Sequence, residues 1–124
     1  MELLGIRFCS VNNQAEKEID FFENGLGLKN SFKDMQDVEG MEGFFGGIFS
    51  TKDGASWAEI WPSGEQMPAG LMLQLVVDNA DSLAQHAEKQ GLDPQGPVDA
   101  HGERIYYIQS PSGLNMSFQS KLEP

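Results

Sequence analysis

The feature that most constrains the fold of this chain is a strand–helix pattern that occurs twice within 124 residues. Residues 11–13 (VNN) and residues 77–79 (VDN) each end a β-prone run, and each precedes a helical stripe that a glycine closes. Further strand-like segments follow in both halves. Each half therefore predicts the order βαβββ, with one module over residues 1–64 and the other over residues 69–124. A half of this size cannot bury its own sheet face, so two halves or two chains must pair.

Eight segments have the alternation, or the β-branched and aromatic content, that predicts strands. They cover residues 3–11, 29–37, 44–50 and 56–61 in the first module, and residues 71–77, 93–98, 103–109 and 114–119 in the second. Charged residues interrupt the second segment, and Pro and Gly interrupt the sixth. Turn sequences separate the segments, among them residues 38–43 and the hairpin-favouring dipeptide Asp53-Gly54.

Two amphipathic helices are expected. A helical stripe runs from Ala15 to Leu26, and the asparagines at positions 12 and 13 can both cap it. A second stripe runs from Ala80 to Ala87 after a possible cap at residues 78–79, and Gly91 ends it. Together these patterns predict a single α+β domain over residues 1–124.

The charge of the chain restricts its partners. Nineteen acidic residues against eight basic ones give a formal net charge of −11, which repels phosphate backbones and anionic membranes. Neither nucleic acid nor membrane is therefore an expected partner. Cys9 is the only cysteine, so no intrachain disulfide forms. The chain shows neither a signal-peptide pattern nor an apolar run of membrane-spanning length, so a cytoplasmic location is expected.

Three segments resemble the vicinal-oxygen-chelate superfamily, which includes glyoxalases, bleomycin-resistance proteins and extradiol dioxygenases. They are residues 19–28 (IDFFENGLGL), 75–80 (LVVDNA) and 108–118 (IQSPSGLNMSF). Members commonly carry an aromatic pair before Leu-Gly, a Val-Asp strand exit and an Asp-Pro-x-Gly turn before the last strand; here Ser110 replaces the Asp of that turn. The resemblance spans nearly the whole chain. It implies two tandem βαβββ modules whose curved, mixed or antiparallel sheets surround a cleft, with the helices outside.

The resemblance also indicates where a metal site would lie. Metal-using members place ligands, usually His, Gln or Glu, on four cleft-facing strand positions. Carried over to this chain, those positions fall at Ile6 or Arg7, and at Glu59, Met72 and Ser117. Only Glu59 offers an oxygen ligand of the kind that a hard divalent ion prefers. The resemblance therefore implies a chain with no metal site and no cofactor.

Strand alternation predicts which other side chains share the faces of the cleft. Together with the positions that the resemblance implies, the candidate ligand-binding residues are Arg7, Trp57, Glu59, Trp61, Met72, Gln74, Tyr107, Asn115 and Ser117. Two tryptophans beside a carboxylate would suit a planar cation, because aromatic faces attract positive charge. The resemblance to metal-free bleomycin-resistance proteins implies a small aromatic or cationic organic ligand and a homodimer. It identifies no catalytic residue.

Several alternatives remain open. Trp57 and Trp61 can instead fill the interior of the sheet, and Glu59 can be solvated or form an ion pair with Arg7 or Arg104. The chain can also be a metal-dependent lyase, isomerase or dioxygenase in which Glu59 is one metal ligand. A third possibility is a structural or interaction module whose own side chains fill the cleft.

Overall fold

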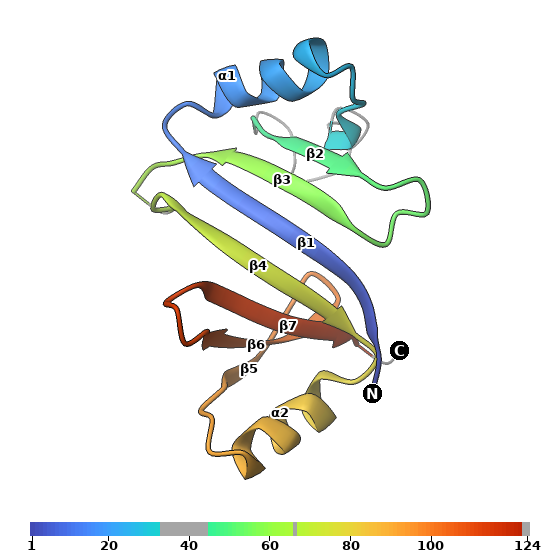
Figure 1. Ribbon diagram of the computed structural model, residues 1–124, viewed down its shortest axis with the longest axis vertical. Helices are drawn as coiled ribbons and strands as arrows, with labels where there is room; N and C mark the ends of the chain where they lie inside the picture. Colours follow the sequence, from blue (N-terminus) through green and yellow to red (C-terminus); the bar gives the residue numbers. More distant parts are fainter. Residues whose placement is uncertain (33–44, 66, 123–124) are drawn as a thin grey trace. The chain divides into compact units, whose positions relative to one another are not determined.

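The computed structural model describes residues 1–32, 45–65 and 67–122. Along this part of the chain lie β1 (Leu3–Asn12), α1 (Ala15–Asp20), the π-helical segment η1 (Phe21–Gly25), β2 (Gly47–Ser50), β3 (Trp57–Pro62), β4 (Gly70–Val77), α2 (Ala80–Lys89), β5 (Gln95–Ala100), β6 (Glu103–Gln109) and β7 (Asn115–Lys121). Backbone hydrogen bonds connect the strands in the order β2-β3-β1-β4-β7-β6-β5 (Figure 1). Strand β4 pairs with β7 in parallel, whereas β2–β3, β5–β6 and β6–β7 are antiparallel. The predicted α+β class with a mixed sheet is confirmed.

The chain folds into two compact units. The first, which we call the α2 unit, consists of Met1–Arg7 together with Met72–Pro124, and the second, the α1 unit, is Phe8–Leu71. Strand β1 runs through both, because its first half belongs to the α2 unit and its second half to the α1 unit.

The α2 unit contains one complete βαβββ module, β4-α2-β5-β6-β7 (Figure 1). Helix α2 begins as predicted at Asn79, whose side chain accepts a hydrogen bond from the Ser82 amide at 3.0 Å. Its buried face is built from alanines, which let the helix pack closely on the sheet. The core beneath it comprises Val77, Ala80, Ala84, Tyr106 and Phe118, and the Tyr106 and Phe118 rings stack with their centroids 5.3 Å apart.

The α1 unit has its own core of Ala15, Ile19, Phe49 and Ile60. Helix α1 begins one residue later than the predicted caps, because Gln14 is its N-cap and Asn12 instead accepts the Gln14 amide at 2.8 Å. At Phe21 the helix widens into a π-turn, in which the Leu26 amide donates to the Phe21 carbonyl at 2.9 Å. Because of this turn, Leu26 does not lie on the predicted apolar stripe, and its side chain is 55% exposed.

The predicted strand at residues 29–37 is wrong at its beginning, where Ser31 and Phe32 form a 3₁₀ turn. The cause is Asn30, whose buried side-chain oxygen accepts the amides of Phe32 at 3.0 Å and Ile48 at 3.1 Å. This local capping competes with a strand ladder. The remainder of that segment and the predicted turn at residues 38–43 lie outside the described residues.

The two faces of β1 differ in exposure. Gly5 is buried and Arg7 is half-buried, whereas Leu4, Ile6 and Phe8 are 52%, 43% and 43% exposed. The strand therefore presents a row of apolar side chains on one face. Within the described residues, no helix is long and apolar enough to cross a membrane.

Candidate binding site

The sheet of the α2 unit brings several predicted residues onto one face. Its strand register places Gln95, Tyr107, Ser117 and Gln74 in one cross-strand row, and Gln109, Asn115 and Met72 in the next. Residues that are partners across a sheet point to the same side, and residues two apart along a strand do so too. This face is opposite to the one that carries Tyr106 and Phe118 and packs against α2.

An open depression of about 360 Å³ lies at the end of these rows. Its lining is Met72, Asp93, Gln95, Tyr107, Ile108, Gln109, Asn115 and Met116. Three of the nine predicted ligand-binding residues, Met72, Tyr107 and Asn115, thus lie together. Tyr107 is 39% exposed, so a phenol ring, the Met72 thioether and three side-chain amides share this face. Met116 and its partner Ile108 belong to the opposite face by strand alternation.

A chain of polar contacts lies behind this depression. The Ser117 hydroxyl donates to Gln119 at 2.8 Å, and the Gln119 amide donates to the Gln74 oxygen at 3.3 Å. The Gln74 amide nitrogen in turn faces the Met72 sulfur at 3.9 Å. Ser117 is only 1% exposed and Gln119 only 3% exposed. Ser117 therefore cannot touch a ligand in this arrangement, and its contacts orient Gln74 and Met72.

A second group of predicted residues meets within the α1 unit. Trp57, Glu59 and Trp61 alternate along β3, and both indole nitrogens donate to the carboxylate between them, at 2.6 Å from Trp57 and 3.0 Å from Trp61. The Cys9 thiol also hydrogen-bonds to Glu59. Burial raises the pKa of this thiol to about 11, and the Glu59 charge and hydrogen bond raise it further in the same direction. The thiol is therefore protonated at neutral pH and unreactive.

Neighbouring residues partly cover this indole–carboxylate cluster of Cys9, Trp57, Glu59 and Trp61. Phe32 packs edge-on against Trp61 with the ring centroids 5.0 Å apart. Gly46 lies so close that an added Cβ would stand 2.1 Å from Trp61 Cζ3. Trp61 thus contributes to packing inside the α1 unit, as one of the sequence alternatives allowed. Arg7 and Arg104, which the sequence offers as ion-pair partners of Glu59, bind other carboxylates within the α2 unit.

The first strand presents Arg7, not Ile6, on the side of the predicted cleft residues. Both terminal nitrogens of Arg7 donate to Glu103, each at 2.9 Å, and both side chains are less than one-fifth exposed. In the register of the sheet, Glu103 pairs with Lys121, which lies on the same face as Gln119 and Ser117. The Arg7 guanidinium therefore forms a bidentate ion pair and is not positioned as a ligand contact.

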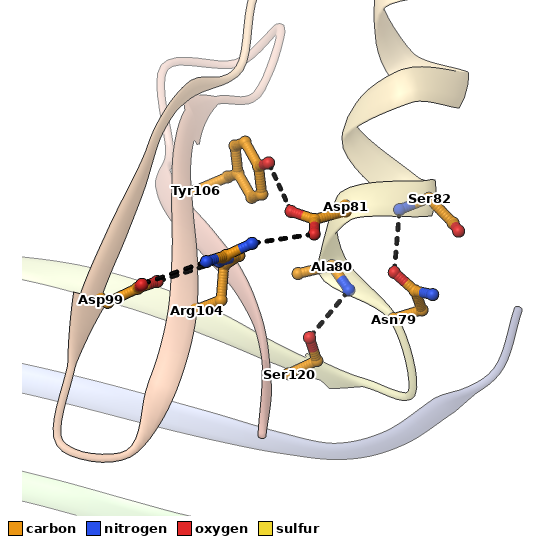
Figure 2. A network of polar contacts seen from close by, with 8 residues as sticks. All are labelled: Asn79, Ala80, Asp81, Ser82, Asp99, Arg104, Tyr106 and Ser120. Carbon is orange, nitrogen blue, oxygen red and sulfur yellow. Dashed lines mark hydrogen bonds and ion pairs between the residues drawn. The ribbon is translucent and has the colours of Figure 1, made fainter. Parts of the chain in front are cut away.

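A polar network on the other side of the sheet fixes the position of β6. Figure 2 shows Tyr106 donating to Asp81 at 2.6 Å, while Arg104 bridges Asp81 at 3.1 Å and Asp99 at 2.9 Å. The network joins the start of α2 to the β5–β6 hairpin. The hydrogen bond from Tyr106 holds the Asp81 pKa below its usual range, with a further contribution from Arg104. The same hydrogen bond raises the pKa of Tyr106 to about 12. Because Tyr107 follows Tyr106, the network also fixes the strand that carries the exposed ring.

Comparison with known proteins places this arrangement in a recognised fold. No protein-family model matches the sequence, and no curated protein matches it. Among solved structures, a methylmalonyl-CoA epimerase in complex with methylmalonyl-CoA and NH4+ gives a TM-score of 0.66 at 14% identity, over 97% of this chain and 96% of that one. A glyoxalase/bleomycin resistance protein/dioxygenase superfamily member from Vibrio splendidus 12B01 gives 0.61 at 13% identity, over 94% and 97%. The chain has the vicinal-oxygen-chelate fold.

The vicinal-oxygen-chelate fold does not by itself fix an activity. A third similar structure is described as an NAD-dependent benzaldehyde dehydrogenase from Legionella pneumophila, with a TM-score of 0.63 at 14% identity over 94% of this chain and 99% of that one. The names of these three proteins differ in chemistry although the folds agree. The sequence resemblance is thus confirmed at the level of the fold, and function must be argued from the site.

Three of the four positions that the family resemblance gives for metal ligands carry side chains that are poor donors for a divalent ion. Arg7 is a cation engaged with Glu103, Met72 offers only a soft thioether, and the Ser117 hydroxyl is committed to Gln119. Both Glu59 oxygens already accept indole N–H groups. Among the described residues, no three His, Cys, Asp or Glu side chains group closely enough to hold a metal ion. Hard cations need several oxygen or nitrogen ligands on one centre.

Sequence reasoning missed five residues in the lining of the depression, which are Asp93, Gln95, Ile108, Gln109 and Met116. Strand alternation can predict Gln109, because it lies two residues after Tyr107 in the same strand. Alternation cannot predict Gln95, because its pairing with Tyr107 depends on a register shift between Gln95 and Val98. Asp93 precedes β5 in an irregular segment, and no periodic pattern marks its position.

Proposed function

We propose that the chain binds a small planar organic molecule, without a metal ion, in the depression on the β4–β7–β6 face of the α2 unit. The observation that carries this proposal is the convergence of Met72, Tyr107 and Asn115 on that depression. A few polar groups in a partly apolar concavity are typical of small-molecule sites. The proposal is one of binding, and it assigns no catalytic residue.

The residues that line the depression offer stacking, apolar and hydrogen-bonding contacts to a flat aromatic ring. The exposed face of Tyr107 can stack on an aromatic ring. Met72 adds polarisable sulfur, which packs well against ring edges. The amides of Gln95, Gln109 and Asn115 can donate and accept hydrogen bonds at the periphery. Gln109 already donates to the Gly113 carbonyl at 3.2 Å and to Asn115 at 3.3 Å, which orients both amides.

The experiment for this proposal is a binding titration with a neutral bicyclic probe, 4-methylquinoline, at a pH where its nitrogen is unprotonated. Replacing Tyr107 by Ala removes the stacking surface and should weaken binding roughly ten-fold. Tyr107→Phe keeps the ring and should bind as the unaltered chain does. Equal affinity of the Tyr107→Ala variant and the unaltered chain would show that the depression is not the site.

A metal-dependent lyase, isomerase or dioxygenase with Glu59 as one ligand is the rival function. Each of the two Glu59 oxygens accepts one indole N–H group. Glu59 is a single carboxylate, whereas a hard divalent ion needs several oxygen or nitrogen ligands on one centre. This shortage of ligands favours the metal-free proposal.

The proposal includes a homodimer. The row of Leu4, Ile6 and Phe8 on β1 is apolar and exposed, and contiguous apolar surface of this kind commonly marks an interface. Each copy carries a formal charge of −11, so two copies repel each other wherever charged faces would meet. Two copies can approach each other on an uncharged surface such as this row. We therefore assign a second copy of this chain as the partner that covers the row.

A further inference from the structure

Asp93 is the single charged residue in the lining of the depression. Among the eight lining residues, the others are apolar, phenolic or amide side chains. Asp93 lies just before β5, and its backbone carbonyl accepts the Gln95 side-chain amide at 3.2 Å. That bond involves only the backbone of Asp93. Among the described residues, the Asp93 carboxylate takes part neither in the strand pairing nor in the polar network around α2.

The arginines of the α2 unit are committed to other carboxylates. Arg7 binds Glu103, and Arg104 bridges Asp81 and Asp99. Neither guanidinium therefore neutralises Asp93. Asp93 therefore adds a carboxylate to the depression that Tyr107 also lines, within a chain whose overall charge already attracts cations.

Glu59 has the opposite character. Each of its two oxygens accepts an indole N–H group, which holds the carboxylate in place inside the α1 unit. A cationic ligand at Glu59 would share this carboxylate with both indoles. The sequence pattern favours Glu59 as the residue that binds a cation. In the structure, the carboxylate that lines the depression is that of Asp93.

We infer that the ligand is a planar aromatic cation whose positive nitrogen lies beside Asp93 while its ring stacks on Tyr107. This inference rests on the proposed function, because it names the ligand class of the same depression. An exposed carboxylate discriminates modestly between charged and neutral ligands, roughly two- to five-fold at low ionic strength. The preference should decline as salt is added.

The test compares two probes of similar shape, the cation N-methylquinolinium and neutral 4-methylquinoline, by their dissociation constants. Asp93→Asn should weaken N-methylquinolinium binding roughly two- to five-fold and leave 4-methylquinoline unchanged. Glu88→Gln is the matched control, since it removes the same charge from an exposed position on α2. It should leave the ratio of the two affinities as it is in the unaltered chain.

Each outcome bears on the inference separately from the proposed function. If 4-methylquinoline binds and loses affinity in Tyr107→Ala, but Asp93→Asn leaves the affinity ratio unchanged, the depression is the site and the charge assignment is overturned. An equal loss in Glu88→Gln would also overturn it, because overall charge would then explain the preference. Failure of both probes to bind the unaltered chain would overturn the proposed function and this inference together.

Discussion

At the residue scale, the surroundings of a carboxylate decide what it can bind. Glu59 lies between two tryptophans, but the edges of the indoles, carrying their N–H groups, point at it. It therefore serves as a hydrogen-bond acceptor inside the α1 unit. Asp93 has no aromatic neighbour in sequence, yet it lines the depression that holds the exposed Tyr107 ring. The same chemical group is structural in one place and available for binding in the other.

Packing around the indole–carboxylate cluster gives a residue-scale prediction. Gly46→Ala would place a methyl group 2.1 Å from Trp61 Cζ3, so the ring must shift and strain its bond to Glu59. We expect the free energy of unfolding to fall by about 1–3 kcal/mol, measured by urea denaturation. Gly64→Ala is the control, because no atom lies within 4 Å of its added Cβ. Equal stability of the two variants would contradict the close packing of Trp61.

At the element scale, helix α2 and the β5–β6 hairpin are joined by ionic and phenolic contacts as well as by the apolar core. Asp81 at the start of α2 accepts from both Tyr106 and Arg104, and Arg104 continues to Asp99 on β5 (Figure 2). A carboxylate in the first turn of a helix is also favoured by the helix dipole. These contacts hold β6, the strand that carries Tyr107, against helix α2.

The hydrogen bond between Tyr106 and Asp81 predicts a pH dependence. The pKa of Tyr106 is raised to about 12 in the folded chain, whereas an unfolded tyrosine titrates near pH 10. Between those values the unfolded state binds fewer protons than the folded state, so stability falls as pH rises. Tyr106→Phe should lower stability at neutral pH by about 1 kcal/mol and flatten the alkaline decline. Urea denaturation across this pH range measures both effects, and an unchanged alkaline slope in the variant would contradict the assigned hydrogen bond.

The elements also show what the sequence could predict. The second helix and residues 103–109 are specified by local patterns, an Asn cap with an alanine stripe and a period of two, and the structure follows them. The end of the first helix and residues 29–32 depend instead on a π-turn and on the reach of the Asn30 side chain to Ile48. In the site, the family resemblance implies Met72. Alternation around the implied positions adds Asn115 and one of two adjacent tyrosines, of which Tyr107 lines the depression. The lining by Asp93 and Gln95 depends on the β5–β6 register, which no local pattern encodes.

At the scale of the whole molecule, the exposed row on β1 and the net charge of −11 act together. In the homodimer that we propose, repulsion would keep acidic faces apart and the neutral row would form the contact. Phe8→Glu adds a charge to the row and should convert the proposed dimer to a monomer, measured by light scattering after size-exclusion chromatography. Leu92→Glu, which changes another exposed leucine outside the row, should leave the mass unchanged. A monomeric unaltered chain, or a Phe8→Glu variant that remains dimeric, would contradict the assignment.

The most direct test of the central claim is an NMR titration of protein labelled at its methionine methyl groups. Because Met72 and Met116 line the depression, ring currents from a bound bicyclic probe should shift the Met72 resonance, and the shift should persist in the presence of a metal chelator. An unmoved Met72 resonance in a titration that moves the Trp57 or Trp61 indole signal, or a shift that the chelator abolishes, would contradict metal-free binding on this face.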